Sequence, residues 1–233
     1  MILDNKIIAI TGAGGALGQA VAKQAARFGA KKLVLIDVIA EIKIDYIKAI
    51  SPQSEIVCHA CDLTDTEATQ ALFSQHPDLD ALCNVAGGFD MGSTVYETSG
   101  QSWDAMFAIN VATMQNAITA CVPNMIAKNG GNIVNVGALG AIQGQALMSA
   151  YIASKSVVMR LTESLAEEVK DKSINVNAVL PNVIDTGRNR ADMPDADYSL
   201  WVKPDDLANV ICMLASELAN AMHGALVPVR GLG

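Results

Sequence analysis

The chain has 233 residues, of which 51% are apolar, and its formal net charge at pH 7 is −8. This length and apolar content suit one large domain with a sizeable core, and no linker or charge block divides the sequence, so we expect a single domain over 1–233. Negative charge spread along the chain argues against nucleic acid and anionic membrane surfaces as partners.

Cysteine usage and the N-terminus bear on the compartment. The five cysteines show no disulfide spacing, which favours a reducing environment, and we therefore expect a cytoplasmic protein. The sequence begins almost directly with an apolar strand and has no cationic region or cleavage site typical of a signal peptide. We also find no uninterrupted apolar run long enough to cross a bilayer.

Short apolar runs alternate with segments of helical periodicity along the chain. The expected strands lie at 6–10, 33–36, around 56–57, around 81–83, and at 132–136, 174–179 and 226–229. The expected helices lie at 16–28, 64–74, 102–126 and 149–169. This alternation predicts right-handed βαβ units and an α/β fold: a doubly wound parallel sheet of the Rossmann type, covered by helices on both faces.

A glycine-rich turn, residues 11–18, separates the first strand from the first helix. Glycines there allow a tight turn and close approach of a pyrophosphate, which the N–H groups of the helix would bind. A P-loop is excluded because no Gly-Lys pair follows at the required spacing. Asp37 ends the second strand nineteen residues after Gly18, where a carboxylate accepts the ribose hydroxyls of adenosine and repels a 2′-phosphate. We therefore expect NAD(H) in preference to NADP(H).

Other candidate cofactor contacts follow the third and fourth strands, at the carboxyl edge where open α/β sheets bind ligands. Asp62 and Leu63 stand where an adenine edge would lie, and a stretch that begins at Asn84 follows the fourth strand. From the turn and these loops, the candidate cofactor-binding residues are Gly12, Gly15, Ala16, Leu17, Gly18, Asp37, Asp62, Leu63, Asn84, Ala86 and Gly87.

Tyr151 and Lys155 lie four residues apart on a predicted helix and so share one face. A lysine beside a tyrosine favours the phenolate, and we therefore expect the pKa of Tyr151 to lie below its ordinary value of about 10. Such a phenol can pass a proton near neutral pH, as hydride-transfer chemistry requires.

Taken together, these motifs resemble the short-chain dehydrogenase/reductase family across essentially the whole chain. The turn reads TGxxxAxG where the family usually has TGxxxGxG, the stretch at Asn84 resembles the family's NNAG, and Tyr151 and Lys155 match its YxxxK. The resemblance implies that Asn110 supports a proton-relay water and that Tyr151 and Lys155 are both catalytic and cofactor-binding. It also implies cofactor contacts after the sixth strand at Pro181, Val183 and Thr186.

One position departs from the family pattern. The family's catalytic serine lies thirteen residues before the tyrosine, and here that residue is Ala138, in a stretch without a hydroxyl. Loss of one donor to a developing oxyanion costs roughly 10²–10³ in rate. A subset of the family, the dihydropteridine reductases, resembles this chain in its alanine at this position, its turn, its fourth loop and a stretch around 193–201. The resemblance therefore implies reduction of a quinonoid dihydropterin or a similarly activated ring, which forms no localised alkoxide.

Two other functions remain open. The chain can be a carbonyl reductase or alcohol dehydrogenase in which Ser149 or Gln143 replaces the serine, or a catalytically silent NAD-binding protein. For each we expect a small-molecule ligand and no metal. The resemblance implies a substrate lid at about 184–203 and a homodimer or homotetramer built on the two long helices.

Overall fold

The parallel sheet of seven strands organises the fold, and the computed structural model describes residues 1–39 and 41–231. The strand order is β3-β2-β1-β4-β5-β6-β7, with every neighbouring pair parallel. The strands are β1 (Ile7–Thr11), β2 (Lys32–Asp37), β3 (Glu55–Ala60), β4 (Ala81–Asn84), β5 (Gly131–Val136), β6 (Ile174–Pro181) and β7 (Leu226–Val229). The predicted α/β fold with a doubly wound sheet is confirmed, and the order reverses between β1 and β4, where such sheets bind ligands.

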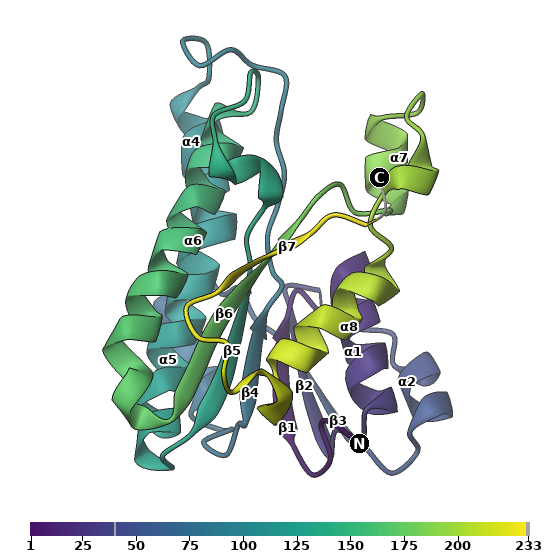
Figure 1. Ribbon diagram of the computed structural model, residues 1–233, viewed down its shortest axis with the longest axis vertical. Coiled ribbons are helices and arrows are strands. Elements are labelled where there is room, and N and C mark those ends of the chain that lie inside the picture. The colour runs from purple at the N-terminus through teal and green to yellow at the C-terminus, as the bar shows by residue number, and fades with distance from the viewer. Residues whose placement is uncertain (40, 232–233) are drawn as a thin grey trace.

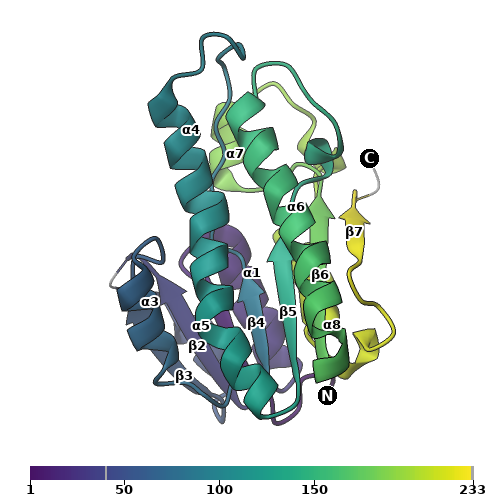
Figure 2. The same cartoon turned by 90° about the vertical axis from the view of Figure 1, so that its left-hand side faces the viewer.

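Helices cover both faces of the sheet (Figures 1 and 2). One face carries α1 (Ala16–Arg27), α2 (Asp45–Ile50) and α8 (Pro204–Leu214). The other carries α3 (Thr66–Phe73), α5 (Thr113–Ala127) and α6 (Ser149–Val169). Above the carboxyl ends of the strands lie α4 (Gly100–Phe107) and α7 (Gly187–Asp192). Short helical turns occupy Leu139–Ile142, Lys170–Lys172, Tyr198–Leu200 and Glu217–Ala219.

The predicted helix over 102–126 is interrupted by a π-helical segment. The helical stretch runs from α4 through the π segment Ala108–Ala112 into α5, so that Asn110 lies within the irregular part. Single-turn π segments are common at functional sites. The whole stretch is long and apolar enough to cross a membrane, with a mean hydropathy of 1.3 over its most apolar window, but half of that window is buried within the fold. Its apolar character therefore suits a helix that packs on the sheet.

The helix α8 was not predicted, although it forms part of the core. It begins at Pro204, followed by Asp205 and Asp206 in the first turn, which are strong signals for a helix start. Its buried residues face α1 on one side of the sheet. The signal was present in the sequence, and the prediction missed it because the segment follows directly on the presumed lid.

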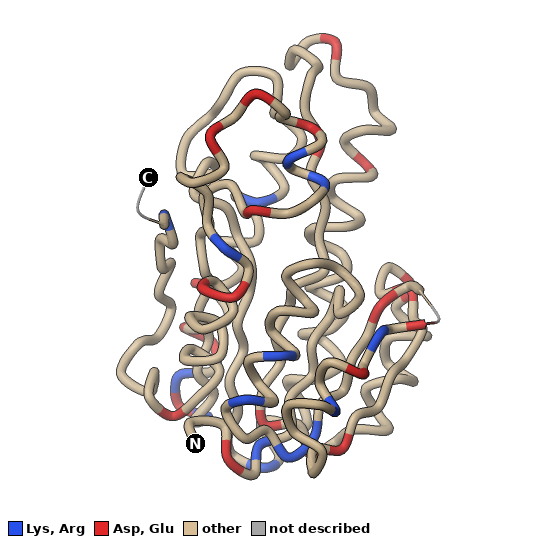
Figure 3. The backbone as a smooth tube through the Cα atoms, turned by 90° about the vertical axis from the view of Figure 1, so that its right-hand side faces the viewer, with Lys and Arg blue, Asp and Glu red and all other residues tan. Residues whose placement is uncertain are grey.

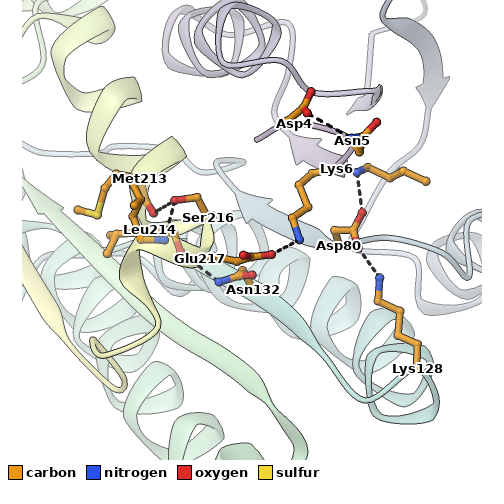
Figure 4. Close-up of polar contacts among 12 residues, drawn as sticks. Asp4, Asn5, Lys6, Asp80, Lys128, Asn132, Met213, Leu214, Ser216 and Glu217 are labelled. Atoms are coloured by element: carbon orange, nitrogen blue, oxygen red, sulfur yellow. Dashed lines mark hydrogen bonds and ion pairs between the residues drawn. The ribbon is translucent and has the colours of Figure 1, made fainter. Parts of the chain in front are cut away.

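Ion pairs hold the amino-terminal end of the sheet, opposite the ligand edge (Figure 4). Lys6 pairs with Glu217 at 2.8 Å, and Asp80 pairs with Lys128 at 2.8 Å while it accepts the backbone N–H of Ile7. Elsewhere, positive and negative residues are interspersed along the backbone (Figure 3). Polar contacts thus fix this end of the sheet, and the ligand edge lies at the opposite end.

We predict that Ile211→Ala lowers the free energy of unfolding by about 2–5 kcal/mol, because the Ile211 side chain lies on the buried face of α8 and is fully buried. Leu218→Ala is the control: that side chain is 67% exposed, and its loss should change stability by less than about 0.5 kcal/mol. Urea unfolding of both variants checks this, and equal effects would contradict the described packing of α8.

Candidate active site

A cleft of about 900 Å³ runs along the carboxyl edge of the sheet. This volume lies within the range of small-molecule and cofactor sites. Most of the predicted site residues line it: Gly12, Gly15, Ala16, Leu17, Gly18, Asp37, Asp62, Leu63, Ala86, Gly87, Tyr151, Lys155, Pro181, Val183 and Thr186. Asn84 and Asn110 do not line the cleft; both are buried behind its wall.

The glycine turn brings backbone against backbone at the floor of the cleft. Gly12 has φ +64°, and a Cβ there would lie 2.8 Å from the backbone of Ala86. A Cβ on Gly18 would lie 2.1 Å from the carbonyl oxygen of Gly12, whereas one on Gly15 would meet its nearest neighbour at an ordinary 3.4 Å. Gly12 and Gly18 are therefore required by the packing of the turn itself.

The carboxylate of Asp37 is held at the far end of the cleft by two backbone N–H groups. Gly14 donates to its Oδ2 at 2.9 Å and Ile39 to its Oδ1 at 3.3 Å. Nearby, Asp62 accepts from the backbone and the hydroxyl of Thr64, and these hydrogen bonds lower the pKa of Asp62. This end of the cleft thus carries negative charge, and among the described lining residues the only basic ones are Lys155 and Arg188.

The loop after β4 is fixed from both sides. The Thr11 hydroxyl accepts the N–H groups of Val85 and Ala86 at 3.0 and 3.1 Å, which joins this loop to the glycine turn. Asn84 donates to Asn135 at 2.9 Å, and the Asn84 Oδ1 atom is buried without a partner among the described residues. Asn84 therefore supports the sheet below the site and does not reach into the cleft.

Asn110 connects this loop to α6. Its Oδ1 accepts the N–H of Gly88 at 2.9 Å, and its Nδ2 donates to the Gly88 carbonyl at 3.2 Å and to the Ser154 hydroxyl at 3.1 Å. A Cβ on Gly87 would lie 2.8 Å from Asn110 Oδ1 and 3.1 Å from Lys155 Nζ. The absence of a side chain at Gly87 is what allows both the amide and the ammonium to lie against the backbone there.

Burial sets the pKa values of the two central groups. It raises the pKa of Tyr151 to about 12 and lowers the pKa of Lys155 to about 8. The Lys155 ammonium donates to the Val136 carbonyl oxygen at 2.8 Å, and the Tyr151 ring contacts Phe89 edge to face at 4.9 Å between centroids. The structure thus differs from the prediction that Lys155 lowers the pKa of Tyr151, because desolvation of the phenol dominates in the chain without a ligand.

Ala138 lies in the cleft wall beside these groups, without a hydroxyl. The two predicted substitutes for serine, Ser149 and Gln143, do not line the cleft, and the Ser149 hydroxyl pairs with Thr98 at 3.1 Å. Gln145 does line it, and its only hydrogen bond to a described residue is a long one, 3.4 Å to Gly140 O. An amide donor is therefore present near the expected serine position, though at neither predicted residue.

The first half of the segment 184–203 contributes to the wall of the cleft. Ile184 bridges to Val202, and the Thr186 hydroxyl caps α7 by accepting the N–H of Asn189 at 3.2 Å. A bidentate ion pair between Arg190 and Asp185 fixes the segment further. Ile184, Thr186, Gly187, Arg188, Asn189 and Met193 face the cleft.

Sequence reasoning missed several lining or supporting residues. Thr11 adjoins the glycine motif and could have been found by its hydroxyl, and Phe89 follows the fourth loop as an aromatic residue among glycines. Gln145 is part of no motif, since its place in the wall depends on how the loops after β5 and β6 meet.

These residues fit a dinucleotide. The cleft is long, its floor is bare backbone where any Cβ on Gly12 or Gly18 would clash, and a fixed carboxylate stands at one end with a phenol and an ammonium at the other. Bare backbone suits close approach of phosphates, and a carboxylate suits ribose hydroxyls.

Comparison with known proteins agrees with this geometry. The family model described as short chain dehydrogenase matches residues 6–197. A 2-(S)-hydroxypropyl-CoM dehydrogenase of Xanthobacter autotrophicus is 30% identical and is matched over 98% of this chain and 96% of its own length. A 3-oxoacyl-(acyl-carrier-protein) reductase of Thermotoga maritima is 27% identical over 99% and 98%, respectively. The carveol dehydrogenase of Mycobacterium avium in complex with NAD superposes with a TM-score of 0.88 at 25% identity, over 98% of this chain and 97% of that one.

The chain belongs to the short-chain dehydrogenase/reductase family. Relatives in this family are NAD(P)-dependent dehydrogenases and reductases, and the prediction of an oxidoreductase that acts on a small molecule is confirmed at that level. The relatives are diverse and give no specific support to a dihydropteridine reductase.

We predict that Gly18→Ala destabilises the protein and weakens NADH binding at least tenfold, because its Cβ would overlap the Gly12 carbonyl. Gly15→Ala is the matched control in the same turn and should leave the melting temperature within about 2 °C of the parent. Thermal melts without ligand, with NADH titration alongside, check both variants. A tolerated Gly18→Ala would refute the described turn.

Lys155 should leave a pH signature on stability. Below about pH 8 this lysine is charged in both the folded and the unfolded chain, so its burial costs about 3 kcal/mol. Between about pH 8 and 10.5 the unfolded chain keeps a proton that the folded chain has lost, so this cost disappears as the pH rises. The free energy of unfolding of the parent should therefore rise relative to that of Lys155→Met as the pH increases through this window.

Urea unfolding at several pH values between 7 and 10 measures this difference. Lys31→Met, at an exposed lysine, provides the control and should follow the parent at every pH. A difference between the parent and Lys155→Met that does not change with pH would contradict the burial of the ammonium.

Proposed function

We propose that the protein is an NADH-dependent reductase whose substrate is a quinonoid dihydropterin or a similarly activated ring. The observation that carries this proposal is Ala138 in the cleft wall next to an intact Tyr151 and Lys155 pair. The cofactor would supply a hydride. Reduction of a conjugated, electron-poor ring spreads the resulting charge, so a proton from Tyr151 suffices and no serine is needed to hold an alkoxide.

In this proposal each residue has a definite task. Tyr151 gives up its proton, and Lys155 binds the ribose next to the reacting ring while its charge offsets that of the developing phenolate. Asn110 holds the loop after β4 and α6 in register through Gly88 and Ser154, and supports the proton relay from behind the wall. The segment 184–203 serves as the lid, with Thr186 and Val183 toward the cofactor.

We propose NAD(H) as the cofactor rather than NADP(H). The carboxylate of Asp37 is oriented by Gly14 and Ile39, so it can accept hydroxyl hydrogen bonds without further rearrangement. A 2′-phosphate would meet this negative charge without a basic residue among the neighbouring lining residues described here. Apart from Asn84, the remaining candidate contacts, from Gly12 to Thr186, line the same cleft and suit the rest of a dinucleotide.

A carbonyl reductase is the second candidate, and one observation favours it. Gln145 faces the cleft with a weakly engaged amide, which could donate to a carbonyl oxygen in place of the serine. The named relatives include a 3-oxoacyl reductase, which supports this alternative. Silent NAD binding is the least supported, since a buried ammonium costs stability, and a protein that only binds the cofactor does not need an intact Tyr151 and Lys155 pair.

We further propose a homodimer or homotetramer that works in a reducing cytoplasm. All five cysteines are free, which suits that compartment. The long helical stretch over 100–127 carries Ile126 as an exposed apolar side chain outside the cleft, which suits pairing with a second copy.

An acceptor panel with NADH tests the function. We expect quinonoid dihydropterin to be reduced faster than simple ketones or a 3-oxoacyl thioester, and Tyr151→Phe to lose about 10²–10⁴ in rate while its affinity for NADH stays within twofold. Faster turnover of the ketones or thioesters would overturn the pterin assignment, and full activity of Tyr151→Phe would overturn the role of the phenol.

Ala138→Ser separates the two enzymatic candidates. For a ring substrate the added hydroxyl should change kcat/KM by less than about threefold, because no oxyanion forms for it to bind. For a carbonyl substrate that still lacks a donor, the same hydroxyl should raise the rate by up to roughly 10²–10³.

Cofactor preference is tested at Asp37. We predict that Asp37→Ser raises the KM for NADH about tenfold or more, because hydrogen bonds to a charged group contribute about 1.5–3 kcal/mol. The same change should lower the KM for NADPH, because it removes the charge that repels the phosphate. Steady-state kinetics with both cofactors measure the ratio, and a parent enzyme that prefers NADPH would contradict the assignment.

A further inference from the structure

A second, smaller cavity of about 330 Å³ opens beside the main cleft. The two cavities share three lining residues, Gly140, Gln145 and Asn182, so they adjoin one another. The remaining walls are Leu139, Ile142, Gln143 and Arg230. These residues follow β5, β6 and β7, whereas Asp37 and Asp62 follow β2 and β3 at the other side of the sheet. The side cavity therefore lies at the substrate end, away from the adenosine end.

The polar groups of this side cavity lie on four exposed residues and make few contacts with the rest of the protein. Three of them are carboxamides, at Gln143, Gln145 and Asn182, and the fourth is the guanidinium of Arg230. Among the described residues, the side chains of Gln143, Asn182 and Arg230 make no hydrogen bond or ion pair, and that of Gln145 makes only its long one to Gly140. None of the described residues that line the cavity is acidic. Donors and acceptors that line one hollow are what a ligand site requires.

By contrast, the part of the main cleft around Tyr151 is largely apolar. Phe89, Ala138, Met148 and Ile152 surround the phenol and suit the faces of a flat ring. They offer nothing to the polar edge of such a ring. Recognition of that edge thus has to come from groups beyond the apolar part.

We propose that the side cavity binds the hydrogen-bonding edge of the substrate ring, an edge that alternates N–H donors with a carbonyl acceptor. Carboxamides can donate and accept, so three of them match an alternating edge, and the Arg230 fork donates to the carbonyl oxygen. The proposal rests on the proposed function and assigns it a specificity site: Gln143, Gln145, Asn182 and Arg230 select lactam-type heterocycles over plain ketones. Leu139 and Ile142 form the apolar rim of this site.

The test is steady-state kinetics with NADH and quinonoid dihydropterin on the full chain, with Asn182→Ala, Arg230→Ala and Gln143→Ala. We expect the KM for the pterin to rise about tenfold in the first two, with kcat and the KM for NADH changed less than twofold, as is typical when binding contributes equally to the ground and transition states. Gln143 is exposed and makes no described contact, so Gln143→Ala keeps the test valid if another variant folds poorly.

The controls separate this proposal from the proposed function. Leu218 lies in an exposed turn and does not line the side cavity, so Leu218→Ala should have the same kinetic constants as the parent. If the parent reduces the pterin and all three variants keep its KM within twofold at an unchanged melting temperature, the side cavity is not the specificity site, while the proposed function stands. If the parent does not reduce the pterin, the proposed function fails and this proposal falls with it.

Discussion

The buried ammonium of Lys155 constrains the rest of the site. It donates to the Val136 carbonyl at the end of β5 and lies close to the Cα of Gly87, opposite Asn110. A charged group in such a place is costly, and burial lowers its pKa to about 8 in response. Hydrogen bonds fix the elements around this ammonium. Thr11 holds the loop after β4, and the contact between Asn110 and Ser154 holds α6.

The same burial explains why the phenol is not acidic by itself. Desolvation raises the pKa of Tyr151 to about 12, and the Lys155 ammonium, which donates to the Val136 carbonyl, does not outweigh this effect. Tyr151 therefore stays protonated until a further positive charge enters the cleft. An oxidised nicotinamide carries such a charge, so the proton-transfer function should depend on the presence of the cofactor.

Much of the architecture could be predicted from the sequence because it depends on local periodicity. All seven strands were located from apolar runs, and the helix at Ser149–Val169 was predicted with its observed bounds. The π segment around Asn110 could not be predicted, because its backbone is set by packing against Gly88 and α6 and not by local propensity. The pKa of Tyr151 was predicted in the wrong direction because a sequence reveals the neighbour on a helix but not the degree of burial.

The site residues also divide into those that local sequence predicts and those that depend on tertiary packing. Motif residues such as Gly12, Gly18 and Asp37 could be found from spacing, since their role follows from one strand–turn–helix unit. Gln145 and Arg230 could not, because the cavity they share forms only where the ends of three strands meet. The predicted substitutes for the missing serine, Ser149 and Gln143, are close to Tyr151 in the sequence. The structure instead places Gln145 in the cleft.

The most direct test of this account is the ionisation of Tyr151 with and without oxidised cofactor. Absorbance of tyrosinate near 295 nm, taken as the difference between the parent and Tyr151→Phe, follows this one phenol. We expect a pKa of about 12 for the chain alone and a value lower by several pH units once NAD⁺ is bound. A pKa that stays the same when NAD⁺ saturates the protein would contradict the claim that this phenol serves hydride transfer.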